Sequence, residues 1–358
     1  MNHIDNKGDN NGEGCMNKNK LLFNKEYEDF YKMAEENEVF SKYCEEVHGI
    51  DFSQDGFSDK KQIDELLIVS GIKPEFKVLE IGCGNGKMAK YIAEKTGATV
   101  YGFDYSENAI TYAKQHAKDN NKLIFDEGII GEKAYPPQSF DVIISIDSMC
   151  YTLDIEGFVQ QLYMWLKPNG LFITFYSEGQ IKSKSKNEDS TDLALAFKHR
   201  EIPYVTVDYT EKHYEFLKHK REVIMKQKDE FLQNNMEFYY RCALSTSIDE
   251  NVSFEDFKKQ FNRYLYIVRK EVDTQELNAE DQEEEAEMNI SVKIAQNKEM
   301  NDNPHNRGVH DEEDEMLEQQ IEQQTERNNG RANIGRANVS TVLGNNQPRR
   351  RLFNLRRF

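Results

Sequence analysis

Residues 78–86, with the sequence VLEIGCGNG, join a short apolar run to three closely spaced glycines. The apolar run is typical of a buried strand, and residues 87–95 after the glycines have helical spacing. Such a turn needs glycine because the backbone must bend sharply and approach a ligand closely. Lys87 stands where a dinucleotide-binding GxGxxG turn would have its third glycine, so the pattern here is GxGxG.

Strands and helices alternate after this turn. Further strands are expected at residues 99–103, 122–125, 140–145, 171–176 and 203–208, with helices at residues 106–118 (capped by Ser106), 155–166 and 211–235 (capped by Thr210). Residues 238–244 and 263–268 are expected to finish the sheet as an antiparallel pair. Such alternation predicts an α/β fold, with a doubly wound, mostly parallel sheet whose ligands bind at the carboxyl ends of the strands.

Composition divides the 358-residue chain into three parts. Residues 1–20 are polar and Asn-rich. Residues 271–330 contain 4 Lys and Arg against 19 Asp and Glu, a net charge of −15, whereas residues 331–358 contain seven Arg and no acid. Such segments bury too little apolar surface to fold. We therefore expect one folded domain at residues 21–270, between a disordered N-terminal tail (1–20) and a disordered acidic tail with a basic end (271–358).

Charge and cysteine usage exclude several classes of protein. The net charge of −18 argues against general nucleic-acid binding by the core. The five cysteines include no CxxC pair, which argues against a disulfide scaffold or a metal site. The sequence has neither an apolar run long enough for a membrane helix nor a signal peptide, so a cytoplasmic protein without membrane contact is expected. Arg349–Arg351 resembles a minimal nuclear import signal, which leaves a nuclear location open, and the Arg-rich end could contact a protein or nucleic acid.

Asp104 ends the second expected strand, where a carboxylate can accept hydrogen bonds from both hydroxyls of a ribose. Residues 75–176 resemble class I S-adenosylmethionine-dependent methyltransferases. The resemblance rests on Asp104 together with three motifs, ExGxGxG (80–86), SFDVI (139–143) and LKPNG (166–170). The resemblance implies their Rossmann-like seven-stranded sheet, an N-terminal helical lid and S-adenosyl-L-methionine as cofactor, with S-adenosyl-L-homocysteine as product and no metal.

The resemblance also implies cofactor-binding positions. Gly82 and Gly84, with Cys83 between them, would face the methionine and ribose, Glu80 the amino group, Asp104 the ribose hydroxyls, Tyr105 the adenine, and Ile146 the sulfonium. One position departs from the family, since the acid that usually contacts the adenine amine is by spacing Ile129. Backbone and packing would then hold the adenine, or the register differs.

The segment after the fourth strand indicates the class of acceptor. It contains neither the Asp/Asn-Pro-Pro-Tyr nor the Pro-Cys motif of base methylation, which favours a small polar acceptor. Residues 146–151, IDSMCY, resemble the corresponding segment of phosphoethanolamine and other small-amine methyltransferases, so nitrogen is favoured over oxygen. Tyr151 stands where those enzymes commonly have a His. We nominate Asp147 to pair with a cationic acceptor and Tyr151 to orient it or accept its proton.

Two segments are expected to roof the site. The first is the lid, residues 21–62, with the aromatic candidates Tyr27, Tyr31, Tyr43 and Phe57. The second is a helical insertion after the fifth strand, residues 177–237. Two other functions stay open: a non-catalytic protein that binds the cofactor or a partner through its tail, and a macromolecular methyltransferase that recruits its target through the tail.

Overall fold

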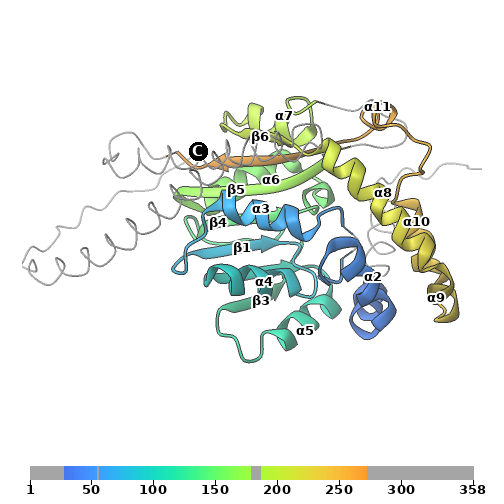
Figure 1. Cartoon of the computed structure of the whole chain (residues 1–358). Coiled ribbons are helices and arrows are strands. Elements are labelled where there is room, and N and C mark those ends of the chain that lie inside the picture. Colours follow the sequence, from blue (N-terminus) through green and yellow to red (C-terminus); the bar gives the residue numbers. More distant parts are fainter. Residues whose placement is uncertain (1–27, 55, 179–186, 272–358) are drawn as a thin grey trace, which may run out of the picture. The chain divides into compact units, whose positions relative to one another are not determined.

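The computed structural model describes residues 28–54, 56–178 and 187–271 (Figure 1). Its sheet consists of β1 (Lys77–Ile81), β2 (Thr99–Asp104), β3 (Leu123–Glu127), β4 (Phe140–Ile146), β5 (Leu166–Glu178), β6 (Val205–Asp208) and β7 (Asn262–Arg269). These seven strands lie in the order β3-β2-β1-β4-β5-β7-β6. All neighbours are parallel except β7, which runs antiparallel to both β5 and β6. The fold class predicted from the sequence is confirmed.

The chain reverses its direction across the sheet at β1, which lies between β2 and β4. Ile81, the last residue of β1, is in register with Phe103 of β2 and Ser145 of β4. The carboxyl ends of these three strands therefore meet directly beside the glycine turn. In an open α/β sheet this is where a ligand binds.

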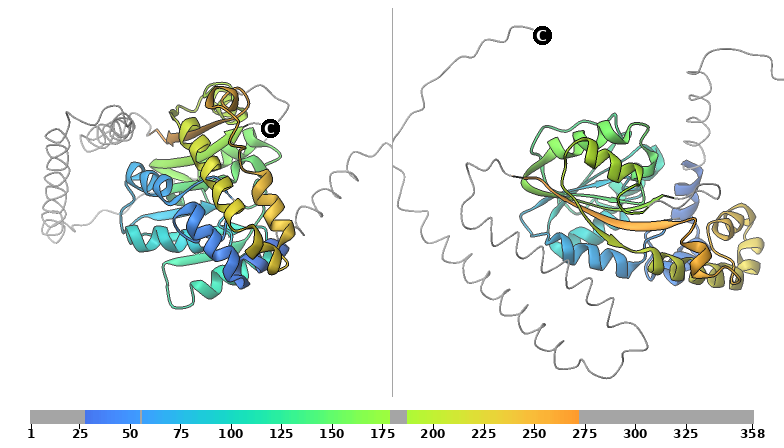
Figure 2. Two further views of the ribbon diagram at one scale, coloured as in Figure 1. Left: turned by 45° about the vertical axis from the view of Figure 1, so that its right-hand side comes forward. Right: turned by 90° about the horizontal axis from the view of Figure 1, so that it is seen from above.

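Helices cover both faces of the sheet (Figures 1 and 2). The helices are α2 (Glu38–His48), α3 (Lys60–Ser70), α4 (Lys87–Thr96), α5 (Glu107–His116), η1 (Met149–Tyr151), α6 (Ile155–Trp165), α7 (Asp192–His199), α8 (Thr210–Lys226), α9 (Lys228–Gln233), α10 (Glu237–Ser245) and α11 (Phe254–Phe257). Apolar side chains of α3, α4 and α5 fill one core against the sheet, and those of α6 and α7 fill another. Among the described residues, no helix has the length and apolar character needed to cross a membrane.

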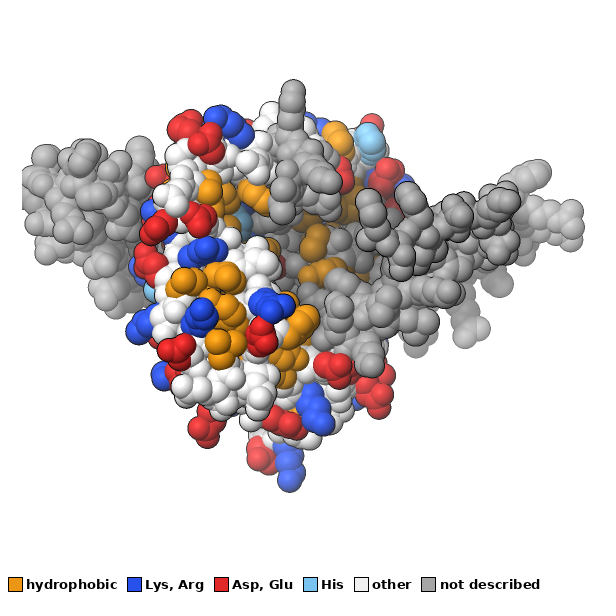
Figure 3. Space-filling view, turned by 90° about the vertical axis from the view of Figure 1, so that its right-hand side faces the viewer, with side chains coloured by type: hydrophobic (Ala, Val, Ile, Leu, Met, Phe, Trp, Pro, Cys, Tyr) orange, Lys and Arg blue, Asp and Glu red, His pale blue; other side chains and the backbone are white. Residues whose placement is uncertain are grey.

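A third apolar cluster joins the lid to the helices near the end of the chain. Side chains from α2, α8, α9, α10 and α11 pack together there. Figure 3 views this side of the molecule, where hydrophobic side chains gather in a patch bordered by charged ones. The exposed large hydrophobic residues of α8–α10 are Met225, Leu232 and Phe238. The expected insertion at 177–237 is divided by β6: among the described residues, α7 lies between β5 and β6, and α8–α11 lie between β6 and β7.

The prediction of a strand at residues 238–244 is wrong, since this segment lies in helix α10. Its aromatic residues suit a strand, but only Tyr240 and Ala243 are buried, which is the spacing of one helical face. The two edges of β7 are already paired with β5 and β6. The long helix expected at 211–235 is two helices, α8 and α9.

Capping side chains explain where several helices begin. Ser106 caps α5 as expected, since its Oγ accepts from the backbone N–H of Ala109 at 3.1 Å. Thr210 does not cap α8, because its Oγ1 accepts instead from the backbone N–H of Arg263 at 3.2 Å. The predicted tails, residues 1–20 and 271–358, lie outside the described residues except for Glu271, and they stay predictions.

Candidate active site

The backbone after β1 turns through Gly82 and Gly84, whose φ angles are 70° and 53°. In this left-handed region a side chain costs about 1–2 kcal/mol. A Cβ on Gly82 would lie 2.7 Å from Cβ of Ser148, and one on Gly84 would lie 2.9 Å from Oη of Tyr31. Both positions therefore require glycine, and the exposed backbone of the turn can approach a ligand closely.

Two buried carboxylates flank this turn. Asp104 accepts hydrogen bonds from the backbone N–H groups of Gly84 and Ser106, both at 3.0 Å. Burial nevertheless raises the pKa of Asp104 to about 6. Burial, and then the charge of Asp104, raise the pKa of Glu80 well above its usual value. Oε2 of Glu80 is buried without a hydrogen-bond partner among the described residues.

The two carboxylates suit a ligand that carries both positive charge and hydroxyl groups. A buried carboxylate without a cation or donor is costly, so a ligand that supplies one relieves that cost. S-adenosylmethionine has a sulfonium, an ammonium group and a ribose, so its charges and hydroxyl donors fit these two acceptors. Among the described residues, no group of three or more His, Cys, Asp or Glu is placed to hold a metal ion.

The remaining cofactor candidates lie around the same turn. Cys83 is buried, and its backbone N–H donates to the carbonyl oxygen of Phe103 at 3.1 Å. Tyr105 directly follows Asp104, and Ile146 ends β4 and packs against the core. Ile129 is half-buried in the loop after β3. Cofactor contacts by these four positions stay predictions.

The first described helical segment, residues 28–36, lies across the glycine turn. The ring of Tyr31 reaches the backbone at Gly84. The carboxylate of Glu28 accepts from the backbone N–H groups of Glu107 and Asn108, at 2.7 and 3.0 Å, at the start of α5. The structure therefore places this segment over the expected cofactor side.

Two further aromatic candidates of the lid are Tyr27 and Tyr43. Tyr27 lies outside the described residues. Tyr43 is fully buried in the third apolar cluster, where its ring contacts Phe40 and Phe231. Tyr43 therefore occupies a core position, in which its ring is covered by Phe231 of α9.

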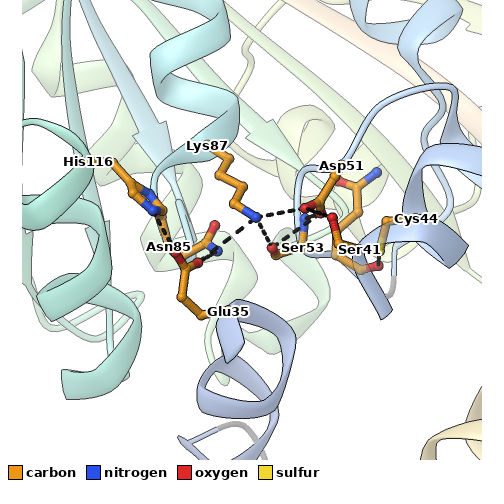
Figure 4. A network of polar contacts seen from close by, with 9 residues as sticks. Glu35, Ser41, Cys44, Asp51, Ser53, Asn85, Lys87 and His116 are labelled. Atoms are coloured by element: carbon orange, nitrogen blue, oxygen red, sulfur yellow. Dashed lines mark hydrogen bonds and ion pairs between the residues drawn. The ribbon is translucent and has the colours of Figure 1, made fainter. Parts of the chain in front are cut away.

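A polar network joins the lid to the glycine turn (Figure 4). Lys87, the first residue of α4, donates from Nζ to Asp51 at 2.8 Å and to Ser53 at 2.6 Å. Burial raises the pKa of Asp51, but hydrogen bonds from Lys87 and Ser41 outweigh it, so the pKa is lowered overall. Lys87 thus fastens the lid loop, defined as residues 51–58 apart from residue 55, to the cofactor side of the site.

The second part of this network centres on Glu35 of the segment 28–36. Glu35 accepts from Nδ2 of Asn85 at 2.9 Å and lies 2.7 Å from Nε2 of His116. The hydrogen bond to Glu35 raises the pKa of His116. Burial opposes ionisation of Glu35, yet the hydrogen bond and charge of His116, with the charge of Lys87, lower its pKa overall. Glu35 therefore joins the lid to Asn85 of the glycine turn and to His116 of α5.

Replacing His116 by Gln is expected to lower the melting temperature more at about pH 6 than at about pH 8. The folded-state pKa of His116 is raised, so the ion pair stabilises the fold fully below the unfolded pKa of about 6.5. That contribution disappears as pH rises through the folded pKa. Thermal unfolding of both proteins across this range tests it, and a difference independent of pH would contradict the assignment.

Asp147, which directly follows β4, contacts the C-terminal end of the lid loop. Its Oδ1 accepts from Nη1 of Arg263 at 2.5 Å, and its Oδ2 accepts from the backbone N–H of Phe57 and from Oγ of Ser58, at 3.0 and 3.1 Å. The structure thus gives the carboxylate of Asp147 a cation from β7. The pairing of Asp147 with a cationic acceptor stays a prediction, and the structure adds Arg263 as a cation beside the same carboxylate.

Tyr151 and Phe57 are the two remaining candidates for the acceptor side. Tyr151 ends the short helix η1 after β4 and is 47% exposed. Phe57 belongs to the lid loop, and its ring contacts the imidazole of His213 edge-on at 5.1 Å between ring centres. Tyr151 is therefore accessible from solvent, and Phe57 packs against His213 of α8.

Sequence reasoning missed Arg263, Glu28, Glu35 and His116. Arg263 stands at the start of the expected strand 263–268, where a charged residue is usually taken to face solvent. In the structure it is completely buried. Lys87 was noted only because it replaces a glycine. The one feature of the sequence that could have indicated Arg263 is its position, as a charged residue, at the start of an apolar strand.

Comparison with known proteins finds methyltransferases. Residues 72–228 match the family model described as "Methyltransferase domain". Phosphoethanolamine N-methyltransferase 3 of Arabidopsis thaliana is 30% identical over 211 residues, which are 53% of this chain but 41% of that protein. The phosphoethanolamine N-methyltransferase of Plasmodium falciparum is 30% identical over 212 residues, covering 53% of this chain and 77% of that protein.

Among solved structures, phosphoethanolamine N-methyltransferase 2 of Haemonchus contortus has a TM-score of 0.55. It was solved in complex with phosphomonomethylethanolamine and S-adenosylhomocysteine, and it is 20% identical over 69% of this chain and 60% of that chain. At this identity the likeness shows the fold alone. From the Plasmodium relative, the family model and the glycine turn with its two carboxylates, we conclude that the chain belongs to the class I S-adenosylmethionine-dependent methyltransferases.

Proposed function

We propose that this protein transfers a methyl group from S-adenosylmethionine to the nitrogen of a small polar amine. The observation that carries the proposal is the pair of buried carboxylates beside the glycine turn. Glu80 would face the ammonium group, Asp104 would accept from the ribose hydroxyls, and Tyr105 and Ile129 would border the adenine. Ile146 would lie beside the sulfonium.

Bound S-adenosylmethionine supplies a methyl group on a positively charged sulfur. The protein's main task is then to hold the acceptor in line with that group and to keep water out. Tyr31 and Phe57 would roof the site from the lid. The phenol of Tyr151 would orient the acceptor nitrogen or take up its proton.

The acceptor that we propose to test first is phosphoethanolamine. Its choice is supported by the names of the Arabidopsis and Plasmodium relatives. It is also supported by charge, because Arg263 and Lys220 place two cationic side chains near Phe57. Their charges, after burial itself, lower the pKa of His213 well below its usual value. Because Asp147 balances the charge of Arg263, the positive charge that favours an acceptor with an anionic group as well as an amine comes from Lys220.

Calorimetric titration of the full chain is expected to show binding of both S-adenosylmethionine and S-adenosylhomocysteine. Methyl transfer to phosphoethanolamine should exceed transfer to ethanolamine at least about tenfold in kcat/KM, because the anionic group adds binding energy. Absence of cofactor binding by the folded protein would favour the non-catalytic alternative. Cofactor binding without transfer to any small amine would favour a macromolecular acceptor.

A further inference from the structure

The guanidinium of Arg263 connects four segments at the acceptor end. Besides Asp147, Nη1 of Arg263 contacts Oγ of Ser177 at the end of β5, at 2.9 Å. Its Nη2 donates to Oγ of Ser58 in the lid loop at 2.6 Å. The guanidinium carbon lies 4.9 Å from the ring centre of Phe175. Strand β7, the loop after β4, the end of β5 and the lid therefore meet at one side chain.

The lid loop depends on this ion pair. Phe57 and Ser58 both donate to Oδ2 of Asp147, so the lid contacts a carboxylate whose charge is balanced by Arg263. Asp147 has a φ of 56°, an unusual conformation for a residue other than glycine. Without Arg263, Asp147 would be a largely buried charge without a cation, and it would be expected to turn toward water. The backbone of the lid would then lose its acceptor.

We propose that Arg263 is a positioning residue, which acts through Asp147 and Ser58 to hold the lid loop closed over the acceptor end of the site. Arg263 is itself fully buried, so it would act on a bound acceptor through the residues around it. The cofactor side of the lid loop is held separately by Lys87. Loss of Arg263 should therefore open the acceptor end while leaving the cofactor side in place.

The first test is hydrogen exchange of the full chain at single-residue resolution. In Arg263→Met, the backbone amide of Phe57 should exchange more than about tenfold faster than in the wild type, because it loses its acceptor. The amide of Gly82, which donates to Phe103 at 3.0 Å on the cofactor side, should stay within about twofold. Arg263→Lys keeps the charge but cannot span Asp147, Ser58 and Ser177, so its effect should be intermediate.

Lys167→Met is the matched control. It removes another ion pair between strands, since Nζ of Lys167 lies 2.6 Å from Oδ2 of Asp141 at the opposite end of β4 and β5. This variant is expected to lower stability without changing exchange at Phe57. Equal acceleration at Phe57 in both variants, or none in Arg263→Met, would overturn the proposal. If Arg263→Met does not fold, Arg263→Lys decides in the same way.

A pairing test separates positioning from loss of fold. The double variant Asp147→Asn with Arg263→Met removes both charges, so it should be no worse than Arg263→Met alone in exchange at Phe57. If the two substitutions accelerated exchange at Phe57 additively, Arg263 would not act through Asp147.

A kinetic test of Arg263 rests on the proposed function. With phosphoethanolamine as acceptor, Arg263→Met should raise the acceptor KM more than about tenfold and leave the Kd of S-adenosylmethionine within about twofold. Equal changes in both would overturn the positioning role. If no transfer to phosphoethanolamine is seen in the wild type, the proposed acceptor fails, and the exchange result still decides the role of Arg263.

Discussion

Replacing Asp104 by Asn should weaken S-adenosylmethionine binding by about 100-fold and also destabilise the glycine turn. Hydrogen bonds to a charged group contribute roughly 1.5–3 kcal/mol each, and the amide can accept at only one of its two ends. The backbone N–H groups of Gly84 and Ser106 already use both carboxylate oxygens of Asp104. The amide would therefore place a donor against one of them. Calorimetric titration of both proteins measures the loss, and near-wild-type affinity would show that the cofactor binds elsewhere.

The same residue gives cofactor binding a pH dependence. The pKa of Asp104 in the free protein is about 6, and the proposed hydrogen bonds from the ribose require the ionised form. Below about pH 6 binding must first displace a proton, so affinity should fall about tenfold per pH unit. The Asp104→Asn variant should lose this slope, and Glu94→Gln on the exposed surface of α4 should keep it. A slope that persists in Asp104→Asn would assign the titration to Glu80.

The cofactor side of the site could be predicted because its determinants are local in sequence. The glycine turn directly follows β1, and Asp104 ends the next strand, so strand assignment alone brings them together. In contrast, the strand predicted at residues 238–244 rested on aromatic composition. The packing of α10 against α8 and α9 decided that segment, and contacts between helices leave no short-range pattern.

The acceptor side could not be predicted in the same way. Arg263 and Asp147 are separated by 116 residues, and Ser58 lies 205 residues from Arg263. Nothing in the neighbourhood of Asp147 indicates that a cation from the last strand neutralises it. The sequence therefore indicated Asp147 as a candidate but not its ion pair with Arg263, because that pair depends on the sheet order, which brings β7 beside β5 and close to β4.

Replacing Gly82 by Ala should abolish measurable S-adenosylmethionine binding, a loss of more than about 100-fold in affinity. The new Cβ would lie 2.7 Å from Cβ of Ser148, a separation that forces one of the two segments to move. Oγ of Ser148 donates to the carbonyl oxygen of Ile81 at 2.7 Å and contacts Oγ of Ser145 at the same distance. Moving Ser148 would thus disturb the turn and the end of β4 together. Calorimetry gives the affinity, and thermal unfolding gives the change in stability.

Gly71→Ala separates the two causes of that loss. Gly71 ends α3 with a φ of 57°, and a Cβ there would meet nothing within 4 Å. Its replacement therefore introduces the backbone strain alone, about 1–2 kcal/mol, without a steric conflict and away from the glycine turn. Gly71→Ala should be destabilised by this amount and bind S-adenosylmethionine like the wild type. If Gly82→Ala lost no more stability than Gly71→Ala and still bound the cofactor, the contact with Ser148 would not restrict the turn. A larger loss of stability in Gly82→Ala, accompanied by loss of binding, would assign both effects to the close approach between the turn and the loop after β4.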